Sequence, residues 1–333
     1  MTKTKKSWPV QLLLFAVLLV CIVLAACVGK YPVSPVESLQ IMLGRTDNTS
    51  EMTVNVVLGL RVPRILASVI VGGALSMSGA AYQGIFKNPL VSPDFLGVSS
   101  GACIGAAVAI LLSLSATYIS VFAFIFGIIA VLVTVAIPAV MGNRTNVMLV
   151  LSGIIVGTAM SSILGFIKYI ADPNTQLASI TYWTMGSFSY ITLADLFAVL
   201  PIIAVPGVIL ILMAWWIDVL SMGEDEARTL GARVGLIRGI TIICATLLTA
   251  GSVCIAGTIS WVGLIVPHFG RMAVGPSNQK LLPMCALLGG LFMLAVDTLT
   301  RTIGTTEMPV SILTGVLGAP IFCWLLFRQR REL

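Results

Sequence analysis

The sequence predicts an all-α polytopic membrane protein that crosses the bilayer with ten transmembrane helices. Hydrophobic residues make up 58% of the 333 residues, charged residues make up 10%, and the mean hydropathy is +1.06. A soluble domain carries about 25% charged residues, so this composition excludes a soluble fold. The charge-free stretches are long enough for spanning helices, which need about 20 apolar residues each.

Charge-free stretches locate most of these helices. Single helices are expected in 7–29, 65–86, 145–167, 281–300 and 308–327. The longer stretch 95–143 has room for two helices with a turn near SLSATY.

Two further stretches predict interrupted helices. In 173–217 we expect one helix near 193–216, preceded by a short or re-entrant segment around QLASITYWTMGSFSY. The stretch 239–270 is too long for one span and too short for two. We therefore expect a full helix followed by a short or broken one, which a membrane tolerates where protein satisfies the freed backbone.

An even number of spans places both termini on one side of the membrane. With the amino end in the cytoplasm, thirteen of the 19 basic residues lie inside and six lie outside. This distribution agrees with the positive-inside rule. We expect residues 1–8 and the loop 218–238 to be cytoplasmic, within one transmembrane domain that covers 1–333. The net charge of +6 therefore does not indicate nucleic acid binding.

The predicted cytoplasmic loop contains the stretch SMGEDEARTLG. Seven charged residues lie between Asp218 and Arg238, out of 32 in the whole chain. Acidic residues at 224–226 suit the positive amino end of a short helix, in which Glu224 and Arg228 can pair one turn apart. Gly231 suits a left-handed cap at its end. This pattern fits a solvated loop helix and a docking surface for another protein equally well.

The residues predict no catalytic or metal site. The chain has no phosphate-binding GxxxxGK[ST] loop and no HExxH motif, and its one histidine, His268, has no Cys, Asp or Glu beside it. Seven cysteines without a CxxC pair indicate small buried packing residues. Cys27, at the end of LAAC, also fits a lipoprotein cleavage site, but a retained first helix is the simpler interpretation. No acidic residue lies in mid-span, which argues against a proton-driven or sodium-driven carrier.

Small residues recur every four positions in two predicted helices. One set is Gly72, Ser76, Ala80 and Gly84, and the other is Gly153, Gly157, Ser161 and Gly165. Each set predicts close helix packing, and the second set also leaves room for a transport path.

Three basic residues lie at predicted outer ends of helices, where the positive-inside rule disfavours them. They are Arg61, Arg64 and Arg301, and Arg301 can pair with Asp297 one turn away. We expect these arginines either to hold an acidic partner or to anchor helix ends at lipid head groups.

Four stretches together resemble the permease subunits of bacterial ABC importers for iron–siderophore complexes, haem or cobalamin. They are RVPRILASVIVGGALSMSGAAYQGIFKNPLVSPDFLGVSSGA, MGEDEARTLG, GTISWVGLIVPHFGRMAVG and EMPVSILTGVLGAP, in this order. The resemblance runs from about residue 55 to the carboxyl end and implies the type II ABC importer permease fold. It also implies a homodimer, or a heterodimer, with two ATPase subunits below and a periplasmic or lipid-anchored binding protein above.

The resemblance assigns roles to particular residues. Short coupling helices between the sixth and seventh spans would contact the ATPase through Gly223, Glu224, Asp225, Glu226, Ala227, Arg228, Leu230 and Gly231. Arg61, Arg64 and Arg301 would contact the binding protein. A cytoplasmic gate would involve Asn88 and Leu90 and, as approximate matches, Thr145, Asn146 and Val147. ATP and magnesium would bind the partner ATPase, and this chain would hold no cofactor.

The resemblance favours a ferric siderophore as cargo and the bacterial cytoplasmic (inner) membrane as location. Haem, cobalamin and oxyanions such as molybdate remain alternatives. A secondary carrier or channel that acts without an ATPase is the alternative from another functional class.

Overall fold

Seven long apolar helices dominate the computed structural model, which describes residues 8–46, 49–142, 145–303 and 307–329. By length and composition, each of the seven could cross a membrane. They are α1 (Trp8–Cys27), α4 (Val62–Phe86), α6 (Ala116–Val140), α7 (Asn146–Ile170), α9 (Leu193–Leu212), α12 (Val234–Ala256) and α14 (Asn278–Thr302).

Three further apolar helices occupy the remaining predicted spans. Two of them are short, α5 (Val98–Leu111) and α13 (Val262–Val274), and the third is α15 (Val310–Gln329), whose apolar part is Val310–Leu325. The stretch 95–143 thus forms two helices, as predicted, with the turn between Leu111 and Ala116. The expected break in 239–270 is also confirmed, because α12 ends at Ala256 and the short α13 starts at Val262.

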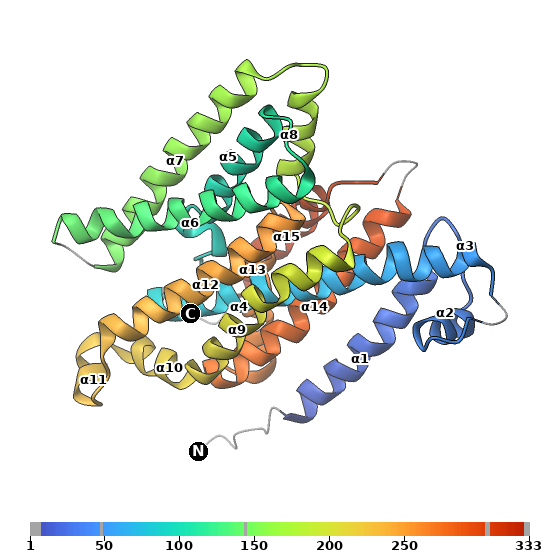
Figure 1. The fold of residues 1–333 in the computed structure, drawn as a ribbon. Coiled ribbons are helices and arrows are strands. Elements are labelled where there is room, and N and C mark those ends of the chain that lie inside the picture. The colour runs from blue at the N-terminus through green and yellow to red at the C-terminus, as the bar shows by residue number, and fades with distance from the viewer. Residues whose placement is uncertain (1–7, 47–48, 143–144, 304–306, 330–333) are drawn as a thin grey trace.

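Short helices connect these elements. The described connections contain α2 (Pro35–Met42), η2 (Pro93–Leu96), α8 (Gln176–Thr184), α10 (Ala214–Met222) and α11 (Glu224–Thr229), while α3 (Glu51–Val54) and the π-helix η1 (Asn55–Arg61) run directly into α4 as one continuous helix. The predicted short segment at QLASITYWTMGSFSY is α8, which packs against α5. In Figure 1, α11 lies at one end of the bundle and α3 lies at the other.

Helix α4 forms the centre of the bundle, between α14, α12 and α13. Small residues allow this approach, because a Cβ atom on Gly72 would lie 2.2 Å from the Gly289 carbonyl oxygen. A Cβ atom on Gly79 would lie 1.8 Å from the Gly263 carbonyl oxygen. Of the first predicted set, Gly72 and Gly84 both lie at such close contacts, since a Cβ atom on Gly84 would lie 2.6 Å from Ile217 Cγ2. These two glycines therefore pack helices together, as predicted.

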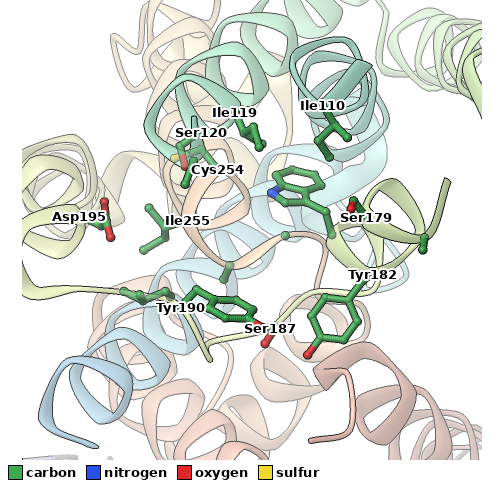
Figure 2. A pocket seen from close by; sticks show the side chains of 16 residues that line it. Ile110, Ile119, Ser120, Ser179, Tyr182, Ser187, Tyr190, Asp195, Cys254 and Ile255 are labelled. Atoms are coloured by element: carbon green, nitrogen blue, oxygen red, sulfur yellow. The ribbon is translucent and has the colours of Figure 1, made fainter. Parts of the chain in front are cut away.

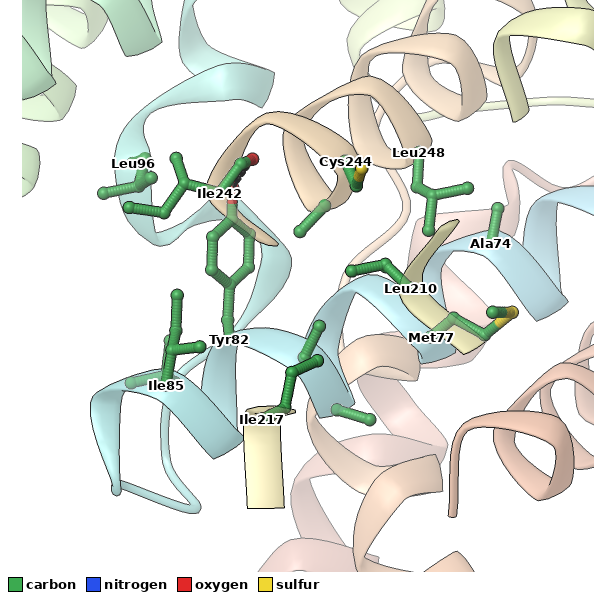
Figure 3. Packing of buried hydrophobic residues seen from close by; sticks show 14 of the residues in the cluster. Ala74, Met77, Tyr82, Ile85, Leu96, Leu210, Ile217, Ile242, Cys244 and Leu248 are labelled. Atoms are coloured by element: carbon green, nitrogen blue, oxygen red, sulfur yellow. Dashed lines mark hydrogen bonds between the residues drawn. The ribbon is translucent and has the colours of Figure 1, made fainter. Parts of the chain in front are cut away.

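A mainly apolar core joins α4 to α12 and α9 (Figure 3). Tyr82 of α4 is fully buried in it, and its hydroxyl lies 2.9 Å from the Thr246 hydroxyl of α12. Leu210 of α9 and Leu248 of α12 belong to the same cluster. Because buried hydroxyl groups need partners, the Tyr82–Thr246 pair fixes the register between α4 and α12.

Candidate functional site

The charged loop forms an ordered helix-turn at one end of the bundle. Gly223 separates α10 from α11, and α11 ends in a Schellman cap. The Ala232 amide donates to the Ala227 carbonyl at 2.9 Å, and the Gly231 amide donates to Arg228 at 3.0 Å. Gly231 has a φ of +79°, so the left-handed cap predicted from the sequence is confirmed.

Ion pairs attach α11 to the start of α12. Arg238 of α12 donates a hydrogen bond to the Glu224 carboxylate, while Arg228 lies 3.9 Å from the same carboxylate. The predicted Glu224–Arg228 pair is therefore present, and Arg238 forms the closer contact. The hydrogen bond from Arg238 holds the pKa of Glu224 below its ordinary value, although partial burial acts in the opposite direction.

The outer surface of α11 is left uncovered in this chain. Asp225, Glu226, Arg228 and Leu230 are exposed, whereas Ala227 is fully buried against the bundle. The exposed set combines both signs of charge with one large apolar side chain. Such a surface can bind a partner protein and fix its register through charge complementarity.

Helix α10 connects this end of the bundle to α14. The carboxylate of Asp218 accepts hydrogen bonds from Ser277 Oγ at 2.7 Å and from the Asn278 amide at 2.6 Å. It also accepts one from Asn278 Nδ2 at 2.7 Å. Asp218 thus caps the amino end of α14, and the charge found in the loop has a structural role here.

The two segments predicted as a gate lie together. Asn146 Nδ2 donates to the Ile85 carbonyl at 3.5 Å, which brings the start of α7 to the end of α4. Asn88 and Leu90 follow α4 and are exposed, and Asn88 Oδ1 accepts from the Leu90 amide at 2.9 Å. Thr145 caps α7 by accepting from the Met148 amide at 3.4 Å, and Val147 is exposed.

Buried charge gathers at the opposite end of the bundle. Arg64 Nε donates to Asp297 at 2.7 Å, and Arg64 Nη1 donates to Glu307 at 2.7 Å. Arg301 lies 3.3 Å from Asp297, which confirms the predicted local pair. Arg61 donates to the Ala26 carbonyl at 2.7 Å and to the Tyr31 carbonyl.

The burial of these three arginines differs from the exposure expected of helix-end anchors at lipid head groups. Arg61, Arg64 and Arg301 are only 6%, 6% and 8% exposed. Carbonyl groups of the segment 26–31 accept from Arg61, carboxylates of Asp297 and Glu307 pair with Arg64, and Arg301 donates to the Ala25 carbonyl. They line a cavity of about 240 Å³ together with Ser189 and Glu307. The pKa of Glu307 lies below its ordinary value, since hydrogen bonds from Ser189 and Arg64 outweigh the opposing effect of burial.

The small residues of α7 behave differently from those of α4. A Cβ atom on Gly153 would lie 2.3 Å from the Phe95 carbonyl oxygen, so this glycine packs closely. Gly157 and Gly165 have nothing within 4 Å of that position, and Ser161 is exposed. Within this chain, most of the second set forms an open, smooth helix face.

A larger cavity at the same end as Glu307 was not predicted from the sequence. It measures about 630 Å³ and lies where α8 meets the starts of α6 and α9 and the end of α12 (Figure 2). Tyr182, Trp183 and Tyr190 line it, with Asp195 at one side. The aromatic residues of QLASITYWTMGSFSY were its only signal in the sequence.

The described residues contain no group of three or more His, Cys, Asp or Glu placed to hold a metal ion. The prediction of buried cysteines is correct for Cys103, Cys244, Cys254 and Cys285. It is wrong for Cys323, which is exposed on α15 because that helix has an uncovered side.

Comparison with known proteins shows similarity over nearly the whole chain. The profile of the FecCD transport family matches residues 17–328. A molybdate import system permease protein from Haemophilus influenzae is 36% identical over 94% of both chains. A protein named as an iron chelatin transport system permease from Helicobacter pylori is 35% identical, over 95% of this chain and 98% of its own.

Two further similarities extend this result. A cobalamin import system permease protein from Halobacterium salinarum is 39% identical, over 82% of this chain and 74% of its own. A solved structure, described as an inward-facing conformation of a candidate metal-chelate type ABC transporter, has a TM-score of 0.87 and 33% identity. It covers 96% of this chain and 99% of its own.

Proposed function

Because this chain belongs to the FecCD transport family and is an ABC importer permease, we propose that it imports a metal chelate, with a ferric siderophore as the favoured cargo. The proposal takes all ten apolar helices as spans, with both termini and α11 in the cytoplasm of a bacterial cell. ATP and magnesium bind a separate ATPase subunit. A second copy of the chain and a substrate-binding protein complete the importer.

The exposed surface of α11 is the observation that carries this proposal. The mixed charges of Asp225, Glu226 and Arg228 suit a protein partner, and the Schellman cap holds the short helix in shape. ATP-driven movement of the partner would displace α11. The Glu224–Arg238 contact links α11 to α12, and the Asp218–Asn278 bonds link α10 to α14.

Helices α12 and α14 both pack against α4, so a displacement of α11 would reach the centre of the bundle from two sides. The permease halves would then open the path alternately to each side. The open face of α7, with Gly157, Ser161 and Gly165, would meet the second copy or line the path.

The buried arginines at the opposite end of the bundle would form the contact site for the binding protein. Arg61, Arg64 and Arg301 line a small cavity rather than an exposed patch, so contact would require an acidic side chain to enter it. Asn146 at the start of α7 donates to the Ile85 carbonyl near the end of α4, shortly before Asn88 and Leu90 in the chain, and this contact supports a cytoplasmic gate there.

An oxyanion is the second candidate cargo. The 36% identity to the molybdate import system permease supports it. A panel of ferric siderophores, haem, cobalamin and molybdate, offered to the reconstituted importer, would separate these cargoes.

Co-purification with the ATPase subunit tests the central proposal. We expect the double change Asp225→Lys and Glu226→Lys to abolish both ATPase association and uptake. Glu37→Lys with Glu51→Lys, at the far end of the bundle, is the matched control and should leave ATPase association intact. Uptake that continues without any associated ATPase would instead indicate a secondary carrier or a channel.

A further inference from the structure

A third cavity lies beside the charged helix, on the side of α11 that faces the bundle. It measures about 510 Å³ and separates the end of α6 and the start of α7 from α11 and the start of α12. Its walls are apolar toward the bundle, where Val135, Pro138, Leu149 and Ile242 line it. We call this cavity the wedge.

Basic groups line the wedge where it reaches α11. Arg228 and Arg238 contribute two guanidinium groups and Glu224 contributes one carboxylate, so the lining has a net charge of +1. The Arg228 side chain is 66% exposed and lies 3.9 Å from Glu224, which leaves most of its donors accessible. Arginine donors match the geometry of phosphate oxygens.

Two glycines keep the wedge open. Gly235 and Gly239 lie one helical turn apart on α12 and both line it. A Cβ atom built on either glycine would have nothing within 4 Å. The space therefore persists because the sequence places no side chain there, and a bulky side chain would fill it.

The position of the wedge along α12 decides what can occupy it. Arg238 lies one turn inside α12, at the level where this apolar span begins. Val140 and Met141, which follow the wedge residue Ala139, are 87% and 63% exposed, so the apolar wall continues onto the outer surface of the bundle. The charged part of the wedge lies at the head-group level and its apolar part extends toward the bilayer interior. A phospholipid has the same arrangement, because its charged head group lies above apolar acyl chains.

We propose that the wedge binds an anionic phospholipid of the cytoplasmic leaflet, with its phosphate at Arg228 and Arg238 and an acyl chain against α6 and α12. Basic pockets between spanning helices on this side of a membrane bind anionic head groups. The bound lipid would contact α11 directly and would stabilise its position relative to α6. The inference rests on the proposed orientation of the chain.

Native mass spectrometry of the purified permease, without the ATPase, measures this binding. Retained phosphatidylglycerol is compared with phosphatidylcholine of the same acyl chains. We expect preferential retention of phosphatidylglycerol by the wild type. Arg228→Gln should reduce it about fivefold, the factor that corresponds to about 1 kcal/mol for one basic residue at an anionic membrane surface.

Filling the wedge gives the second test. Gly239→Leu places a side chain in open space and raises helix propensity, so it should fold and lose the bound lipid. Gly59→Leu is the matched control, because Gly59 also has open space and lies at the other end of the bundle. We expect the control to retain the lipid.

Several outcomes would overturn the inference. They are equal retention of the two lipids, unchanged retention in both Arg228→Gln and Gly239→Leu, or displacement of the lipid by inorganic phosphate alone. If Gly239→Leu fails to fold, the lipid comparison and Arg228→Gln still decide the question. If the permease binds the ATPase but shows no preference between the two lipids, this inference alone is wrong. If the permease prefers phosphatidylglycerol but never binds an ATPase, only the proposed function is wrong.

Discussion

Arg64 of α4 and Asp297 of α14 form a buried ion pair, with Nε and Oδ1 2.7 Å apart. Their side chains are 8% and 0% exposed, although 233 residues separate them in the chain. Asp297 also pairs with Arg301 at 3.3 Å. One carboxylate thus holds two arginines at the end of the bundle opposite α11.

Replacing this carboxylate should be strongly destabilising. Asp297→Asn leaves Arg64 and Arg301 buried without the negative charge that pairs with them. Breaking a buried ion pair lowers the free energy of unfolding by about 3–5 kcal/mol. Thermal unfolding in detergent should show a marked loss of stability. Asp225→Asn, at an exposed position, should unfold like the wild type. Equal unfolding of both variants would show that the buried network contributes nothing to stability.

Close packing of α4 predicts a contrast between two glycines. Gly72→Ala would place a Cβ atom 2.2 Å from the Gly289 carbonyl oxygen, so the helices must separate. Overpacking of this kind typically costs about 1–3 kcal/mol. Gly157→Ala meets nothing within 4 Å, and the unfolding of the isolated chain should not be destabilised. Chemical denaturation of the two variants checks the difference.

The Schellman cap of α11 predicts a backbone effect at Gly231. Gly231→Ala forces a residue with a side chain into a φ of +79°, at a cost of about 1–2 kcal/mol. The Ala232 amide donates to the Ala227 carbonyl, so its hydrogen exchange reports on the cap. Its exchange should become about five- to thirtyfold faster, the factor that corresponds to this loss of free energy. Gly231→Asn is the matched control, because asparagine tolerates this conformation better. Identical exchange in the wild type and both variants would show that the cap is not limiting.

The Glu224–Arg238 contact predicts a dependence on pH. The folded-state pKa of Glu224 lies below its unfolded value, chiefly because Arg238 donates a hydrogen bond to it. Its contribution to stability is therefore complete above the unfolded pKa, near 4.3, and decreases as the pH falls through the folded pKa. Glu224→Gln should lose this part of the acid sensitivity. Unfolding midpoints between neutral pH and about pH 3 measure it, and parallel curves for both proteins would contradict it.

Local properties of the chain predicted most of the helices and the cap of α11. Apolar stretches located the ten apolar helices of the described residues, including the break between Ala256 and Val262, because length and composition decide where a helix can lie in a bilayer. Gly231 was identified as the cap because few other residues adopt its backbone conformation.

Three features needed the tertiary structure. Asp297 of α14 and Glu307, in the segment before α15, pair with Arg64 of α4, and only the tertiary packing of these segments brings the three groups together. Small residues recur with the same spacing on α4 and on α7, but they pack tightly on α4 and stay open on most of α7. Whether such a set is covered depends on which helix lies opposite it. The wedge beside α11 exists because Gly235 and Gly239 face a space between helices that are distant in sequence.

The sequence by itself therefore determined the membrane class, the helices and the charged helix-turn, because these follow from hydropathy and local backbone preference. The tertiary structure alone decided which charges are buried and which glycines remain uncovered. For Arg64 and Gly72 the contacting residues lie more than two hundred positions away in the chain, and their places are set by the packing of the whole bundle.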